Sequence, residues 1–272
     1  MAYRRVAPLL SILVIITLLA GCSLPAGDSN PSTLEEDPAD VFEGAFVHAD
    51  ELESVHGERT TEIVIGNGSD AETRTERVAV YERPYVDYRS EVLESSEPDR
   101  VGDVYVSNAS TTWWYDPDAN AASYFAPEEP FDDDAVRSDR AEQADYQQDL
   151  YDLEYEGTET VADRDAHVLA VEAKNETVTE GLSVLVGDTE FVYALETVDP
   201  GEELVVHEQR LWIDAEYEFP LKEQLVVEAD EENERYVMTE RFENVTFNGD
   251  VDDETFAFEP PENATVTDLG AD

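Results

Sequence analysis

Apolar and polar residues alternate along the stretch from Thr75 to Phe125. Apolar residues two positions apart recur within this stretch, and clusters of Pro, Asn, Asp and Ser separate them. A period of two that is broken by turn residues predicts an antiparallel meander with one buried face. We expect the buried face to be apolar and aromatic, and the solvated face to be acidic. The alternating pairs are Val78 and Val80, Val104 and Val106, and Trp113 and Tyr115.

Strand patterns dominate the chain from Arg59 onward, and two segments, one before Arg59 and one after it, have a helical period instead. Apolar residues spaced by three and four predict one helix over Asp40–His56, stopped at Gly57, and a second over Asp139–Leu153. About a dozen strands with only two helices predict a β-dominated (α+β) fold, with the helices lying across one strongly curved antiparallel sheet. The predicted strands are Thr60–Ile65, Arg77–Tyr81, Tyr85–Val92, Asp103–Ser107, Thr111–Tyr115, Ala121–Phe125, Leu153–Val161, His167–Ala173, Leu182–Val186, Phe191–Leu195, Leu204–Ile213, Leu221–Glu228, Arg235–Phe247 and Phe256–Phe258.

The N-terminus has the features of an export signal. Arg4 and Arg5 precede a 15-residue apolar run over 6–20, which is shorter than the roughly 20 residues that a membrane-spanning helix needs. The run ends in Leu-Ala-Gly-Cys, a sequence similar to the lipobox of lipoprotein signal peptides. Cys22, the single cysteine of the chain, is then the predicted lipid anchor. The alternative is an ordinary signal peptide with an incidental cysteine.

These features predict three parts of the chain. Residues 1–21 are the predicted lipoprotein signal peptide, and residues 22–38, rich in Ser, Pro, Gly and acids, are the predicted tether behind the lipid anchor. Residues 39–272 form the predicted folded domain. We therefore expect an exported protein on the outer face of the cytoplasmic membrane.

The charge of the chain restricts its partners. It contains 16 Lys and Arg against 67 Asp and Glu, for a formal net charge of −51. This balance excludes a nucleic-acid-binding protein, because no basic surface is available to neutralise phosphates. The apolar fraction of 41% is too high for a disordered acidic chain. The excess of acids and the scarcity of lysine indicate a host that lives in high salt, where charge repulsion is screened.

No motif predicts catalysis, a cofactor or a metal. One cysteine allows no intramolecular disulfide. The four histidines, His48, His56, His167 and His207, lack the spacing of a zinc pair. No nucleophile elbow, P-loop or dinucleotide fingerprint is present, and no carboxylate pair stands out among so many acids. Asp132–Asp134 could hold a cation, although a solvated acidic loop is the expected reading.

Modification and ligand binding supply the remaining candidates. Five Asn-x-Ser/Thr sequons are possible glycosylation sites in an exported protein. A curved sheet covered by helices encloses a cavity, and an apolar cavity is the default ligand site; the alternative is that its aromatic residues fill a core. The sequons are at Asn67, Asn108, Asn175, Asn244 and Asn263, and the candidate cavity residues are Tyr81, Tyr85, Tyr88, Trp113, Trp114, Tyr115, Trp212, Tyr236 and Met238, with Tyr124 and Phe125 in the same strands.

Three motifs in order resemble the LolA family, the outer-membrane lipoprotein carriers, together with LolA-like lipoproteins of salt-loving archaea. They are Arg83-Pro84 ahead of a Tyr-rich strand, the segment 106–117 with its Trp-Trp-Tyr-Asp-Pro end, and Phe256-Ala-Phe258-Glu-Pro-Pro. The resemblance implies an incomplete β-barrel covered by two or three helices, with an apolar cavity for lipoprotein acyl chains. It also implies that Arg83 latches the helical lid through hydrogen bonds to helix carbonyls. The family carriers are usually soluble, whereas this chain has the features of a lipid-anchored protein.

Three functions are compatible with these features. The leading hypothesis is a membrane-tethered LolA-like protein that binds a lipid or a lipoprotein acyl chain for carriage or sorting, and is not an enzyme. The alternative is a sensor or protein-interaction module on the same scaffold, held near a membrane protein partner. A surface hydrolase acting on glycans is the third hypothesis.

Overall fold

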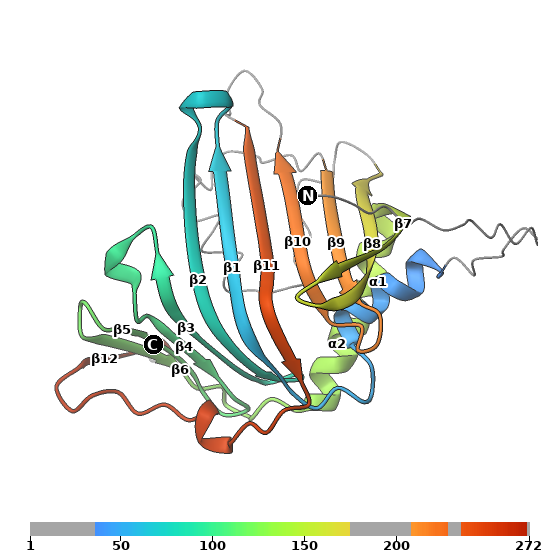
Figure 1. Cartoon of the computed structure of the whole chain (residues 1–272). Helices are drawn as coiled ribbons and strands as arrows, with labels where there is room; N and C mark the ends of the chain where they lie inside the picture. The colour runs from blue at the N-terminus through green and yellow to red at the C-terminus, as the bar shows by residue number, and fades with distance from the viewer. Residues whose placement is uncertain (1–35, 175–207, 228–234, 271–272) are drawn as a thin grey trace, which may run out of the picture. The chain divides into compact units, whose positions relative to one another are not determined.

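A computed structural model describes residues 36–174, 208–227 and 235–270, all within one compact unit spanning Glu35–Asp272. Its centre is a twelve-stranded sheet in the order β12-β6-β5-β4-β3-β2-β1-β11-β10-β9-β8-β7 (Figure 1). Every pairing is antiparallel except that of β12 with β6. The strands are β1 (Val55–Ile65), β2 (Glu72–Arg83), β3 (Asp87–Ser95), β4 (Val104–Ser107), β5 (Thr112–Asp116), β6 (Ala121–Phe125), β7 (Tyr151–Val161), β8 (Arg164–Ala173), β9 (Glu208–Asp214), β10 (Pro220–Val227), β11 (Tyr236–Phe247) and β12 (Thr265–Asp268).

The sheet consists of two meanders that meet at one central pairing. β1 to β6 run outward in sequence order on one side, and β7 to β11 return inward on the other, so that β1 pairs with β11. β7 and β12 end the order, and the sheet is therefore open rather than closed into a barrel. Figure 1 shows β4, β5, β6 and β12 turned away from the plane of β1, β2 and β11. The predicted single curved antiparallel sheet, an incomplete barrel with helices, is confirmed.

Two helices cover one end of this sheet. α1 (Pro38–Val47) buries Phe42 and Phe46, and α2 (Asp133–Leu150) buries Ala144, in a cluster with residues of β7, β8 and β9. We call the face of the sheet beneath these helices the inner face, and the opposite one the outer face. The sheet residues of this cluster are Tyr151, Leu169, Val171, Leu211 and Ile213.

The first helix is shorter than predicted. It ends at Val47, and the following residue, His48, has a positive φ of 53° that takes the chain out of the helix. The residues from Val55 onward belong to β1, so the prediction of a helix to His56 is wrong there. Gly57 lies within β1, where a Cβ would sit 2.1 Å from the carbonyl oxygen of Asn244. The glycine therefore permits a close approach of β1 and β11, and is not a helix stop.

The second helix begins earlier than predicted. Asp132 is its N-cap, and the Asp132 carboxylate accepts a hydrogen bond from the backbone N–H of Ala135. Asp133 and Asp134 occupy the first turn, where negative charge stabilises a helix. The acidic run predicted to be a loop is thus a helix start, and Leu153, the predicted helix end, lies in β7.

The C-terminal part holds the largest difference from the strand prediction. Phe256–Phe258 is not a strand, because the chain forms a 3-10 turn over Asp253–Phe256 and leaves it at Ala257. The strand β12, by contrast, was not predicted from the sequence. The other two 3-10 turns are Gly68–Asp70 and Pro98–Arg100. The predicted strands Leu182–Val186 and Phe191–Leu195 lie outside the described residues.

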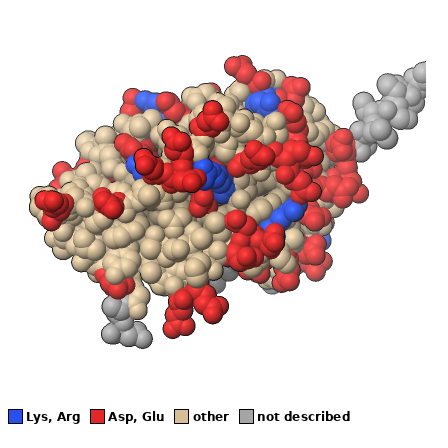
Figure 2. Space-filling model, turned by 90° about the horizontal axis from the view of Figure 1, so that it is seen from below, with Lys and Arg blue, Asp and Glu red and all other residues tan. Residues whose placement is uncertain are grey.

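The surface is acidic, as the composition predicts. Figure 2 shows one face, on which the few Lys and Arg side chains lie among many Asp and Glu. Several arginines form ion pairs, for example Arg77 with Glu58 and Glu94. In the described part of the chain, no helix is both long enough and apolar enough to span a membrane.

Candidate functional site: a pocket on the inner face

One cross-strand row of side chains defines the candidate site. Ser90 on β3 is paired with Tyr105 on β4, Tyr105 with Trp114 on β5, Trp114 with Ser123 on β6, and Ser123 with Thr267 on β12. Residues directly opposite each other in adjacent strands point to the same face. The strand pairing places this row on the inner face. Arg59 on β1 pairs with Val78 on β2, and Val78 pairs with Val92 on β3, which lies two residues from Ser90 and so shares its face.

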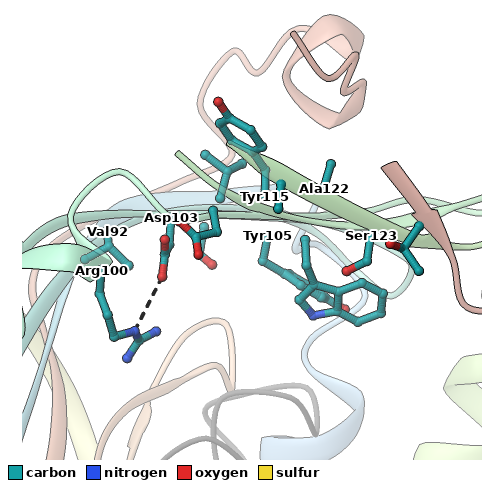
Figure 3. A pocket seen from close by; sticks show the side chains of 13 residues that line it. Val92, Arg100, Asp103, Tyr105, Tyr115, Ala122 and Ser123 are labelled. Carbon is teal, nitrogen blue, oxygen red and sulfur yellow. Dashed lines mark ion pairs between the residues drawn. The ribbon is translucent and has the colours of Figure 1, made fainter. Parts of the chain in front are cut away.

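All five members of this row line a pocket of about 320 Å³. Figure 3 shows Tyr105 and Ser123 pointing to one side of the sheet, together with Asp103 and Arg100, whereas Tyr115 and Ala122 point to the other side. Val92 adds an apolar side chain to the wall. The helices pack at the β7–β9 end, and the pocket lies at the opposite end of the same sheet.

Three aromatic rings run along this part of the inner face. The ring centroids of Tyr88 and Tyr105 are 5.6 Å apart, and those of Tyr105 and Trp114 are 5.5 Å apart with an edge-on geometry. All three side chains are half-buried. The hydroxyl of Tyr88 accepts a hydrogen bond of 3.4 Å from Arg59, which is buried and also pairs with Glu240 at 2.6 Å. The buried Arg59 thereby orients the ring of Tyr88, the first of the three aromatic rings.

The rim of the pocket carries charge. Arg100 forms an ion pair of 2.8 Å with Glu76 and one of 3.5 Å with Asp103, and Asp116 lines the pocket nearby. Burial raises the pKa of the Asp103 carboxyl; Arg100 opposes this shift, and the charge of Asp116 adds to it. Arg100 thus pairs with two carboxylates, and Asp116 adds a further negative charge to the pocket.

A tight turn brings Arg100 and Asp103 together. Gly102 between them has a φ of 92°, a backbone conformation that favours glycine. Its N–H donates to the carbonyl of Val92, and the N–H of Val92 donates to the carbonyl of Asp103. These bonds fix the loop between β3 and β4 against the end of the pocket.

The predicted cavity residues do not all lie on one face. Trp114 is in the pocket, but Trp113 and Tyr115 alternate with it and lie on the outer face. There the ring of Phe258 lies 5.7 Å from Trp113 and 5.6 Å from Tyr115. Val106, also on this face, is 1% exposed. In β4 to β6, therefore, the outer face is packed against the C-terminal segment and the inner face carries the half-buried pocket, so the expectation of one buried and one acidic face is wrong for these strands.

The remaining predicted residues are dispersed. Tyr81 stacks on His56 on the outer face, and the Tyr85 hydroxyl donates to the carbonyl of Val47 at the end of α1. Trp212 lies under the ammonium group of Lys222, 3.7 Å from the ring centroid, and its N–H donates to Glu159. Tyr236 and Met238 are buried with Leu225 in a separate small cluster. Tyr124 contacts Trp113, and Phe125 is exposed.

Arg83 contacts the C-terminal segment. Its guanidinium pairs with Asp253 at 2.7 Å, donates to the carbonyl of Val251 and lies over the ring of Phe256 at 5.1 Å. Asp87 is 3.7 Å away. The hydrogen bond to a helix carbonyl that a lid latch requires is made by Tyr85, two residues later. The latch role of Arg83 stays a prediction, and its observed partners fasten residues 251–256 to the outer face.

The histidines do not form a metal site in the described residues, which contain no cluster of three or more His, Cys, Asp or Glu that could hold a metal ion. His48 is buried, and desolvation, aided by nearby Arg140, lowers its pKa to about 3. His167 shares a hydrogen bond of 3.1 Å with the Tyr155 hydroxyl. His207 lies outside the described residues.

The sequons differ in accessibility. Asn67 and Asn263 are exposed next to turns, and Asn244 is exposed within β11. The Asn108 amide donates to the carbonyl of Phe256 and its oxygen accepts from two backbone N–H groups, so this side chain is engaged. Asn175 and the predicted anchor Cys22 lie outside the described residues.

Tyr105 is the pocket residue that the sequence reasoning missed. The alternation predicted that its neighbours Val104 and Val106 form the buried pair of this strand, but their side chains face outward. The alternation itself could have identified Tyr105, since it places Tyr105 on the same face as Asp103, and the pairing of β4 with β5 places Trp114 on that face too.

Comparison with known proteins gives distant structural likenesses. No family model matches the chain, and no curated protein sequence matches it. Similar solved structures include the MucA/MucB complex of Pseudomonas aeruginosa, at 16% identity over 82% of this chain and 61% of that one, with a TM-score of 0.45. A LolA superfamily protein from Nitrosomonas europaea is similar at 12% identity over 80% of this chain and 96% of that one, with a TM-score of 0.34.

The Mycobacterium tuberculosis lipoprotein LppX is also similar, at 11% identity over 79% of this chain and 98% of that one, with a TM-score of 0.35. All three TM-scores lie below 0.5 and describe a distant likeness of fold. Solved structures similar to this chain thus include a LolA superfamily protein and a lipoprotein.

Proposed function

We propose that this protein binds the apolar part of an amphiphilic ligand, such as a lipid acyl chain, in the inner-face pocket and performs no chemistry on it. The observation that carries the proposal is the pair of half-buried rings, Tyr105 and Trp114, side by side in a pocket of about 320 Å³. Aromatic faces left partly open to water gain free energy when an apolar ligand covers them.

The size of the pocket limits the ligand. Small-molecule sites typically enclose about 300–1,000 Å³, and this pocket lies at the lower end of that range. We therefore propose that one chain, and not a lipid with several chains, enters it. The polar lining groups Ser123 and Arg100 would lie near the outer end of the ligand.

We further propose that the protein acts as a carrier or sorting factor, tethered to the outer face of the cytoplasmic membrane. Cys22 would carry the lipid anchor, and residues 22–38 would give the domain reach. The sequence features of the N-terminus support this proposal. A carrier needs only reversible binding, which apolar burial at roughly 25 cal/mol per Å² supplies.

A matched pair of tryptophan variants tests the binding site. Trp114→Ala removes a ring from the pocket, whereas Trp113→Ala removes the neighbouring ring from the outer face. If a ligand covers roughly 60–100 Å² of the Trp114 ring, its loss weakens binding by about 10-fold or more. The measurement is titration of the full-length chain with dodecyl maltoside below its critical micelle concentration, by calorimetry.

Equal affinities in the two variants would contradict the assignment of the pocket. Mass spectrometry of the purified protein adds a second test, because the proposal expects a co-purified lipid. A single stoichiometric protein partner, found without lipid, would favour the sensor or interaction module instead.

A further inference from the structure

The charge around the pocket narrows the class of ligand, on the basis of the function proposed above. The carboxylates of Asp103 and Asp116 line the pocket together with the guanidinium of Arg100, which pairs with Asp103 and also with Glu76 next to the pocket. Arg100 is held by two of these carboxylates and is therefore already neutralised. A ligand with an anionic end would have to displace one of them, and would meet the remaining negative charge.

The aromatic rings of the pocket favour a ligand with a positive charge. The faces of Tyr and Trp rings attract cations, and quaternary ammonium groups are commonly recognised by aromatic residues. Tyr105 and Trp114 lie on the same face of the sheet as Asp103, as Figure 3 shows for Tyr105 and Asp103. A positively charged group between them would contact rings on one side and a carboxylate on the other.

We infer that the ligand of this pocket is an amphiphile whose apolar chain adjoins a positively charged amine, protonated or quaternary. The apolar part contacts Val92 and the two rings, and the ammonium group lies near Asp103. The cation would stabilise the charge of Asp103 in particular, because this carboxylate is partly desolvated and Arg100 contacts it at the long distance of 3.5 Å. The cation would therefore add to the partial compensation that Arg100 gives to the Asp103 carboxylate.

The test compares three ligands that share a dodecyl chain. They are dodecyltrimethylammonium, neutral dodecyl maltoside and anionic dodecanoate, each below its critical micelle concentration and each titrated into the full-length chain. We expect the ammonium ligand to bind about 10-fold more tightly than the maltoside, and dodecanoate to bind most weakly. Titrations are repeated in about 1 M NaCl, which screens diffuse attraction to the acidic surface but not contacts within the pocket.

A second matched pair of variants locates the effect. Asp103→Asn removes the charge in the pocket, and Asp99→Asn removes one from an exposed position in the same turn, outside the pocket. We expect Asp103→Asn to lower the preference for the ammonium ligand over the maltoside by about 5-fold, and Asp99→Asn to leave the preference unchanged.

The outcomes separate the two proposals. If the ammonium and maltoside ligands bind equally and Trp114→Ala weakens both, the charge inference is overturned and the binding site stands. If the ammonium ligand binds in a way that Trp114→Ala, Asp103→Asn and Asp99→Asn do not alter, it binds the acidic surface, and the inference is likewise overturned. If none of the three ligands binds, the proposed function itself fails.

Discussion

Arg83→Ala distinguishes the two roles that this residue can have. The family resemblance implies a latch between Arg83 and the helices, whereas the contacts in the structure join it to Asp253, Val251 and Phe256. If these contacts are the important ones, the substitution loosens the C-terminal segment and leaves the helices in place.

The size of the effect follows from the contacts. Asp253 is 94% exposed, so its ion pair with Arg83 contributes only ~0.2–1 kcal/mol. The contact with the ring of Phe256 adds ~0.5–1 kcal/mol, and the charged hydrogen bond to the carbonyl of Val251 adds ~1.5–3 kcal/mol. The segment is therefore held by roughly 2–5 kcal/mol through Arg83, and even the lower figure corresponds to about 30-fold in its opening equilibrium.

Amide hydrogen exchange measures this opening segment by segment. We expect exchange to rise at least about 30-fold at Thr255 and Ala257, whose backbone N–H groups donate hydrogen bonds within this segment. Arg77→Ala is the control, because Arg77 lies on the same strand and pairs with Glu58 and Glu94 instead. Faster exchange in α1 and α2, with residues 251–270 unchanged, would refute this reasoning and restore the latch.

Two further predictions concern stability. Gly57→Ala forces a methyl group against the backbone of Asn244 and should lower the free energy of unfolding by about 1–3 kcal/mol or more in urea titrations. Gly249→Ala should lower it less, because its nearest contact is the side chain of His56 and not backbone. Equal losses would contradict the close-approach role of Gly57. His48 has a folded pKa of about 3 against 6.5 when unfolded, so the unfolded chain binds the proton first and the wild type loses stability as pH falls through this window. Relative to His48→Asn, which tolerates the positive φ, the loss should approach about 1.4 kcal/mol per pH unit between pH 6 and 4, and parallel stability profiles for the two proteins would argue against a neutral buried His48.

The meander was predictable because its signal is local. Alternation between Val78 and Val80, and turn residues such as Asp116-Pro117, report directly on strands and on their ends. Its faces were less predictable, because alternation separates two faces without saying what covers each. Trp113 and Asn108 contact Phe258 and Phe256, which lie about 150 residues later in the chain. No local pattern contains that information.

Other elements escaped prediction for similar reasons. Gly57 follows a segment with apolar residues spaced by three and four, and this pattern predicts a helix that stops at the glycine. Pairing with β11 instead places Gly57 inside a strand. β12 has four exposed residues and no apolar alternation, and it exists because β6 offers it a parallel partner. The pocket was predicted only in part. Trp114 was among the predicted residues, whereas Tyr105 and Asp103 were not, because their place in the pocket depends on the register of β4.

The order of the strands also determines when the molecule can complete its architecture. Hairpins within each meander join residues that are near in sequence, whereas β1 must find β11 across some 180 residues, from Val55↔Phe247 to Ile65↔Tyr236. Loop-closure entropy makes such distant pairings late and slow. Until β1 and β11 pair, the aromatic rings of the pocket belong to one half of the sheet alone. Assembly of the binding surface and packing of the helices against β7, β8 and β9 are therefore separate events along the folding route.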